Sequence, residues 1–178
     1  MVRTSQMAEL FYYTENELQR AFVRSYMWNK QRYAFVAPNC YLNYGNFTEF
    51  DLLCIRRSGF SDEVEIKRTV SDFRADFMKT GIHGLKKHDL LEASNSQTNY
   101  FWFLMTDELA EKMKDEIPDY AGVYVKRHSF VRELKKAPRL HKNKISDKTR
   151  IHLGEKMMHR YWRQVQSEIN RRERNGRG

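Results

Sequence analysis

The sequence predicts an α+β fold in which helices flank a mixed β-sheet. The expected elements follow the order helix, strand, strand, strand, helix, strand, and this order suits a layered domain whose helices cover a sheet. The segment Tyr100–Met105 is apolar throughout, as expected for a strand that is buried on both faces. With 178 residues, 40% of them hydrophobic, the chain is long enough to bury a substantial core.

Local signals place each element along the chain. Thr14 and Glu17 fit a capping box, in which the residue before a helix and the residue three positions later exchange hydrogen bonds. Pro38 ends a strand pattern, and Gly81 and Gly84 interrupt a helical one. The expected elements are a helix over 14–29, strands over 32–37, 48–55 and 63–68, helical segments between 71 and 93, a strand over 100–105, a short helix over 106–114, paired strands over 121–126 and 129–134, and a helix over 146–172.

The chain is expected to form one main domain over residues 1–145, extended by residues 146–178. This extension is predicted to be a long helix and a basic tail that pack on the same domain. Its helix carries a stripe of apolar residues, namely Ile151, Met158, Tyr161, Trp162, Val165 and Ile169.

Charge and cysteine content narrow the class of partner. The formal net charge of +9 favours a polyanionic partner, nucleic acid before an anionic membrane. No apolar run approaches the roughly 20 residues of a membrane span. Cys40 and Cys54 lack the spacing of a metal knuckle, so we interpret them as free thiols in a reducing cell interior.

Two neighbouring strands carry charged residues at alternate positions. Asp51 lies on the first of them, and Glu65 and Lys67 lie on the second. Because alternate residues share one face of a strand, Glu65 and Lys67 point the same way. A hairpin turn centred on Ser58 would pair residues whose numbers sum to 116, so that Asp51 faces Glu65 and Glu49 faces Lys67.

This arrangement suits phosphate chemistry. Two adjacent carboxylates repel one another, and they therefore need a bound metal or a raised pKa. Lys67 beside them fits a site that activates water against a phosphate. The alternative is a solvated strand face with cross-strand ion pairs, and Asp51 argues against it because its neighbours in the strand are apolar. Glu17 has two interpretations, as a helix cap or as an extra metal ligand.

A second copy of the same pattern occurs further along the chain. Asp119 follows a proline, and Glu133 and Lys135 follow it at the spacing of the first copy. We favour the first copy because Asp119 lies in a proline-containing connection, and because the turn between the second pair lacks a glycine.

The segment Glu65–Phe77 resembles the PD-(D/E)XK nuclease superfamily, and more narrowly the MmcB-like DNA repair proteins and their phage-borne relatives. The shared features are a strand ending in Glu-x-Lys, a following Ser-x-x-Asp-Phe-type helix start, and the downstream Lys87-His88 pair. The resemblance covers about residues 14 to 145, and it departs from the superfamily pattern at Phe50, where a proline would precede the aspartate.

The resemblance implies a restriction-endonuclease-like αβββαβ core and a Mg²⁺- or Mn²⁺-dependent deoxyribonuclease of DNA repair, recombination or phage DNA metabolism. It implies an intracellular setting, in bacteria or in phage-infected cells, without a membrane or a nucleotide cofactor. By position, Asp51 and Glu65 would bind the metal with the backbone carbonyl of Ile66, and Lys67 would lie beside the attacking water. The main alternative is a catalytically silent DNA-binding domain of the same fold, and a third is a basic adaptor.

Several basic residues follow the predicted site along the chain. They are expected either to contact phosphates of bound DNA or to form an ordinary solvated helix surface. These residues are Arg68, Lys79, Lys86, Lys87 and His88.

Overall fold

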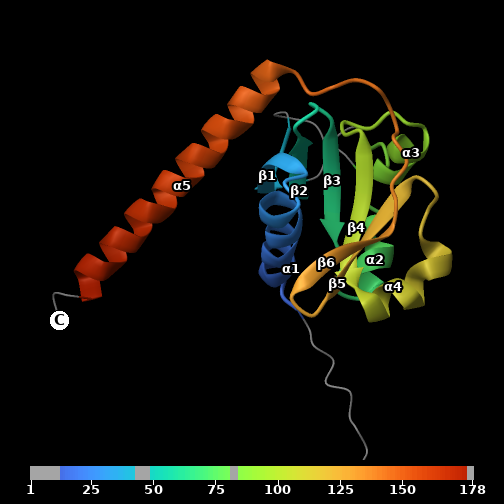
Figure 1. The fold of residues 1–178 in the computed structure, drawn as a ribbon, viewed down its shortest axis with the longest axis horizontal. Helices are drawn as coiled ribbons and strands as arrows, with labels where there is room; N and C mark the ends of the chain where they lie inside the picture. The colour runs from blue at the N-terminus through green and yellow to red at the C-terminus, as the bar shows by residue number, and fades with distance from the viewer. Residues whose placement is uncertain (1–12, 43–48, 81–83, 176–178) are drawn as a thin grey trace, which may run out of the picture.

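The computed structural model describes residues 13–42, 49–80 and 84–175, and its central feature is one six-stranded sheet. The strands lie in the order β1-β2-β3-β4-β5-β6 (Figure 1). β3 pairs in parallel with β4, and β4 with β5, whereas the other neighbours are antiparallel, so the predicted mixed sheet is confirmed. The strands are β1 (Tyr33–Cys40), β2 (Phe50–Arg56), β3 (Ser61–Ile66), β4 (Tyr100–Thr106), β5 (Ala121–Arg127) and β6 (Phe130–Lys135).

Helices cover both faces of this sheet. The first is α1 (Glu15–Phe22), which continues as a π-helical segment η1 (Val23–Asn29). The opposite face carries α2 (Val70–Asp76), α3 (Lys87–Glu92) and α4 (Asp107–Met113), the last followed by a 3₁₀ turn η2 (Lys114–Glu116). The predicted αβββαβ order, the additional β5–β6 hairpin and the long C-terminal helix α5 (Asp147–Asn175) are all confirmed.

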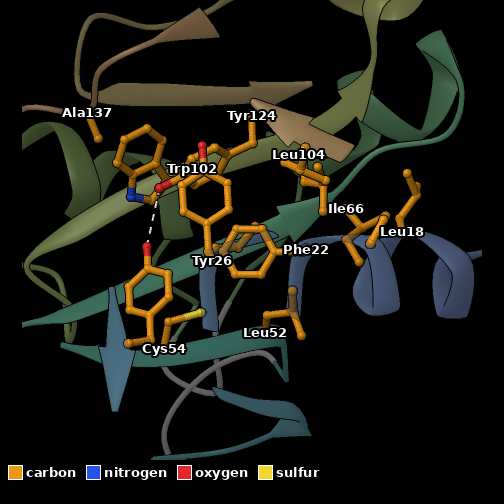
Figure 2. Packing of buried hydrophobic residues seen from close by; sticks show 14 residues of the cluster. Leu18, Phe22, Tyr26, Leu52, Cys54, Ile66, Trp102, Leu104, Tyr124 and Ala137 are labelled. Carbon is orange, nitrogen blue, oxygen red and sulfur yellow. Dashed lines mark hydrogen bonds between the residues drawn. The ribbon is translucent and has the colours of Figure 1, made fainter. Parts of the chain in front are cut away.

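An aromatic core joins α1 and η1 to the sheet. Phe22 and Tyr26 pack against Tyr124, with ring centroids 5.2 Å and 4.7 Å from it, and Trp102 stacks on the same ring at 4.1 Å (Figure 2). The other face carries a second core of apolar residues, in which Phe73 of α2 lies among the side chains of β4, β5 and α4. β4 is buried on both faces because each core takes alternate residues of it, as its apolar sequence predicts.

Local sequence signals explain two details of the fold. The capping box is present, since the Glu17 N–H donates to Thr14 Oγ1 (3.3 Å) and the Thr14 N–H to a Glu17 carboxylate oxygen (2.7 Å). β1 does not end at Pro38 as predicted but runs on to Cys40. β1 is an edge strand, and an edge strand can accommodate a proline because the missing N–H need not pair with a neighbouring strand.

The long helix α5 differs from the prediction. Only its first half contacts the domain, where Leu153 and Met157 join a small apolar cluster and Arg160 donates to the backbone oxygens of Pro38 and Asn39. The rest extends away from the body of the protein (Figure 1). The predicted packing on the domain is therefore wrong for the second half of the helix. The exposed residues of the predicted stripe include Ile151, Met158, Tyr161, Trp162 and Ile169.

The structure also bears on the predictions for the cysteines, for membrane-spanning segments and for the chain around Gly81. Cys40 and Cys54 are buried and unbridged, as the free-thiol interpretation requires. None of the helices in the described part of the chain has the length and hydropathy needed to cross a membrane. The predicted helix break at Gly81 and the end of the basic tail lie outside the described residues.

Close packing around Gly122 leads to a stability prediction. A Cβ atom at this position would lie 2.3 Å from the Trp102 ring and 2.6 Å from the Ala137 backbone nitrogen. Gly122→Ala should therefore lower the free energy of unfolding by about 1–3 kcal/mol, the usual cost of overpacking a core. Gly154→Ala is the control, because nothing lies within 4 Å of its Cβ and alanine favours the helix. Urea denaturation measures both variants, and an unchanged midpoint for Gly122→Ala would contradict the packing.

Candidate active site

The register of the β2–β3 hairpin brings Asp51 to the Glu65-Ile66-Lys67 segment. Leu52 pairs with Val64 and Leu53 with Glu63, so paired residue numbers sum to 116 as predicted. Asp51, the next residue towards the start of β2, accepts a hydrogen bond at Oδ2 from the Ile66 N–H (2.7 Å). The hairpin alone therefore determines that the Asp51 carboxylate lies at the end of β3.

The charged face of β3 is buried under α2 and α3, and it is not a solvated strand surface. Glu63 and Glu65 lie beside Phe101 and Phe103 of β4 in the parallel register. Glu65 is fully buried and Lys67 is 1% exposed. Glu49, which was expected to face Lys67, is exposed and lies within hydrogen-bonding range of the Tyr41 hydroxyl instead.

Three lysines surround the buried carboxylates. Lys67 Nζ lies 3.2 Å from Glu65 Oε2 and 2.7 Å from Asp76 Oδ1. Lys79 Nζ contacts the same two oxygens at 3.3 Å and 2.7 Å. Lys87 Nζ lies 2.6 Å from Glu63 Oε1 and 2.8 Å from Glu65 Oε1. Three ammonium groups thus balance the three carboxylates of Glu63, Glu65 and Asp76.

The pKa values of these acids follow from burial opposed by the lysines. Burial acts to raise the pKa of Glu65, but Lys87 and the other ammonium groups bring it below its usual range. Burial likewise opposes ionisation of Asp76, yet the His88 hydrogen bond and the three lysines hold its pKa well below the usual range. For Glu63 burial dominates over Lys87, and the pKa is raised.

A hydrogen-bonded chain fixes Asp76 through Oδ2, the carboxylate oxygen that Lys67 and Lys79 do not contact. His88 Nε2 lies 2.8 Å from Asp76 Oδ2, and His88 Nδ1 lies 2.6 Å from the Tyr120 hydroxyl. The imidazole ring stacks on Phe77 with a centroid separation of 4.1 Å. Asp76 is therefore held by groups on three segments, and it in turn holds Lys67 against Glu65.

Asp51 is the carboxylate of this group that forms no ion pair with the three lysines. No ion pair neutralises it within the described residues, and the only hydrogen bond to its side chain there comes from Ile66. Burial first, and then the negative charge of Glu65, raise the pKa of Asp51 to about 7. Such a carboxylate either takes up a proton near neutral pH or binds a cation.

The acidic residue of α1 that affects Asp51 is Glu15, and not Glu17. Glu17 is occupied by the capping box at the exposed start of the helix. The charge of Glu15 contributes to the raised pKa of Asp51. Gln19 connects the two, because its Nε2 donates to Glu15 Oε1 (3.0 Å) and to the Asp51 backbone oxygen (3.2 Å). The i, i+4 spacing of Glu15 and Gln19 was the sequence signal for this helix face.

Two of the residues that were expected to contact DNA are buried in the structure. Lys87 is 7% exposed and His88 is 5% exposed, and both are engaged with buried carboxylates, so they do not reach a phosphate. Lys79 is half-exposed but paired with Glu65 and Asp76. Arg68 and Lys86 remain exposed and available to a ligand.

The second copy of the motif does not form a comparable site. Asp119 is fully exposed, and Lys135 Nζ lies 3.9 Å from it. Glu133 pairs instead with Arg32 at 3.0 Å. These carboxylates are solvated and have different partners, so the second copy does not gather its charged residues in one place.

The carboxylates near Asp51 are of the kind that a small divalent ion of the Mg²⁺ type uses as ligands. In the ranges that the structure describes, no group of three or more His, Cys, Asp or Glu side chains is arranged to hold a metal. Mg²⁺, however, needs only one or two carboxylates, with water and substrate oxygens completing its shell. Asp51 would supply a carboxylate that forms no ion pair within the described ranges, and Glu65 would supply one whose two oxygens already contact lysines.

Comparisons with known proteins identify the fold alone. No family model and no curated protein matches the sequence. Among solved structures, the chain is similar to the SPO1766 protein of unknown function from Silicibacter pomeroyi, with 15% identity and a TM-score of 0.57. The match covers 87% of this chain and 90% of that one, so the likeness extends over most of the fold.

The raised pKa of Asp51 predicts that ionisation of this carboxyl lowers the stability of the folded protein in a pH-dependent way. Well below pH 3.8 the carboxyl is neutral in folded and unfolded chains alike, and the free energy of unfolding falls as the pH rises from there towards 7, because the unfolded chain ionises first. Asp51→Asn should therefore stabilise the metal-free protein at pH 8 by on the order of 2 kcal/mol, a value reduced for the partial exposure of the carboxyl.

Urea unfolding of both proteins in EDTA, at pH 4.5 and at pH 8, measures this difference. The gain should largely disappear at pH 4.5. A variant that is less stable than wild type at pH 8 would show that the Asp51 carboxylate is compensated after all.

Proposed function

We propose that the protein is a divalent-metal-dependent deoxyribonuclease that hydrolyses phosphodiester bonds. The observation that carries the proposal is the Asp51 carboxylate, which forms no ion pair with any described residue and lies at the end of β3 near Glu65 and Lys67. Perturbed carboxylates beside a fixed ammonium are typical of catalytic sites. The resemblance of the segment Glu65–Phe77 to PD-(D/E)XK nucleases supports the same assignment and suggests a role in DNA repair, recombination or phage DNA metabolism.

In this proposal each residue has a separate task. Asp51 and Glu65 hold Mg²⁺ or Mn²⁺, with the Ile66 carbonyl as a further donor. When bound, such an ion lowers the pKa of a coordinated water and offsets negative charge on the phosphate. Lys67 keeps a buried positive charge beside Glu65, and Asp76 keeps the Lys67 ammonium in that place. A fixed ammonium stabilises negative charge that develops in the transition state.

The exposed basic residues support DNA as the substrate. Arg68 and Lys86 are exposed near the site, and they replace Lys87 and His88 as candidate phosphate contacts. The second half of α5 adds Arg163, Arg171 and Arg174, which are exposed and fall on one side of the helix. Together with the net charge of +9, this distribution favours contacts to the DNA backbone.

A catalytically silent DNA-binding domain is the second candidate, and one observation favours it. Lys67, Lys79 and Lys87 already neutralise Glu65 and Asp76, so the cluster can be stable without a metal. The two candidates share the fold and the basic surface, and they differ only in whether DNA is cleaved. Incubation of the protein with single-stranded, duplex and branched DNA in Mg²⁺, Mn²⁺ or EDTA distinguishes them.

Asp51→Asn should abolish cleavage although it stabilises the fold. The substitution keeps an acceptor for the Ile66 N–H and removes the charge that would hold the metal. We expect a loss of at least about 10²-fold in the cleavage rate, the scale of a lost electrostatic group. Asp119→Asn is the matched control, because that carboxylate is fully exposed, and it should cleave normally. Cleavage by Asp51→Asn at the wild-type rate would refute the site.

Binding to DNA should weaken steeply with salt and depend on α5. In Ca²⁺, the slope of log affinity against log salt should become shallower by up to about 2 in Arg171→Gln/Arg174→Gln, since each lost duplex phosphate contact removes about 0.9. The charge-matched control is Lys112→Gln/Lys114→Gln, on the distant helix α4 and its following turn (Figure 1). Fluorescence anisotropy measures both slopes. Equal slopes in the two variants would remove α5 from the DNA-binding surface.

A further inference from the structure

We propose that Lys79 is a displaceable internal counter-ion: its ammonium neutralises Glu65 and Asp76 in the metal-free protein and leaves them when a divalent ion binds. The inference rests on the proposed function, because it concerns the same metal site. It reconciles two features of that site, a carboxylate that would bind a metal and the ammonium groups that already occupy it.

Exposure distinguishes Lys79 from the other two lysines. The side chains of Lys67 and Lys87 are 2% and 8% exposed, whereas that of Lys79 is 38% exposed. If Lys67 or Lys87 left its carboxylate, the ammonium would remain buried without a partner, at a cost of several kcal/mol. Lys79 can exchange the carboxylates for water, and its flexible four-carbon side chain regains conformational freedom when it does so.

The backbone around Lys79 is anchored while its side chain is not enclosed. The Lys79 N–H donates to the Asp76 backbone oxygen (3.1 Å) just after α2, and the Lys79 backbone oxygen accepts from the Lys87 N–H (3.2 Å) at the start of α3. A β-bridge between Thr80 and Lys86 closes the base of the connection. The ammonium can therefore move by side-chain rotation alone, without displacement of α2 or α3.

The charge balance of the fully ionised cluster favours such a movement. Four carboxylates, those of Asp51, Glu63, Glu65 and Asp76, face three ammonium groups, so the ionised cluster carries one net negative charge. A bound divalent cation would turn this into one net positive charge in a largely buried site. Neutrality is restored when one ammonium leaves, and Lys79 is the one that reaches solvent. At the rim of the site, it is then free to contact a phosphate oxygen of the substrate.

The test is the affinity of the full-length protein for Mn²⁺ in the absence of DNA. Removal of the competing ammonium in Lys79→Met should tighten Mn²⁺ binding by about tenfold, which corresponds to about 1.4 kcal/mol. Lys79→Arg keeps the charge and should bind at nearly the wild-type affinity. Lys86→Met is the matched control, because it removes an exposed charge close by in the chain and should have little effect. Calorimetry and the EPR signal of free Mn²⁺ report the affinity independently of cleavage.

A second measurement uses the wild-type side chain, so that it does not depend on the folding of Lys79→Met. After reductive methylation with ¹³C, the Lys79 NMR signal, identified by its absence in Lys79→Arg, should move to the position of freely solvated lysines as Mg²⁺ is added. A protein that binds metal with an unmoved Lys79 signal, or a Lys79→Met variant with unchanged or weaker Mn²⁺ affinity, overturns the inference and leaves the nuclease proposal standing. If wild type and all variants bind no Mn²⁺, both proposals fail.

Discussion

Burial of the Glu65 carboxylate is the interaction on which much of this structure depends. Glu65 lies on β3 near the middle of the sheet, fully buried beside Phe103 of β4. An unpaired carboxylate in such a place costs several kcal/mol, so the fold has to bring cations to it. Lys67 directly follows the same strand, but Lys79 lies just after α2 and Lys87 lies at the start of α3. The charge on one strand thus positions two helices.

These helices are too short to be stable by themselves. α2 has seven residues and α3 has six, well below the length at which an isolated helix forms in water. α2 contributes Phe73 to the apolar core and Asp76 to the charge cluster, so its two contacts lie one turn apart on the same side. Removal of the ionic partners would therefore loosen the cover of the site as well as change its charge.

The sequence predicts local geometry well and long-range partners poorly. The hairpin register followed from a turn and a period of two, both of which are local properties, and it placed Asp51 correctly beside Ile66. Lys87 and His88 were misassigned to a DNA-binding surface, because a basic pair on a short helix does not reveal which carboxylates it meets. Asp76 was not recognised as part of the site for the same reason.

The same limit applies to the helices at the two ends of the chain. The capping box explained Glu17 completely, yet the residue that approaches Asp51 is Glu15, whose role depends on how α1 docks on the sheet. For α5, an apolar stripe predicted burial, but amphipathicity states only that a helix has two faces. In the structure Leu153 makes the contact with the domain, and Trp162 faces solvent.

The contrast between the partly buried Asp51 and the fully buried Asp62 shows why Asp51 is best understood as a functional residue. Asp62, on the opposite face of β3, is fully buried and receives two hydrogen bonds from Arg56, one from Tyr33 and one from Trp102, at 2.7–3.0 Å. This fold can therefore satisfy an aspartate completely. Asp51 receives one backbone N–H in the described part of the structure and faces the like charge of Glu65. The Asp51 carboxylate lowers the stability of a fold that could have compensated its charge. Such a residue is expected at a site where a bound ligand supplies the missing positive charge.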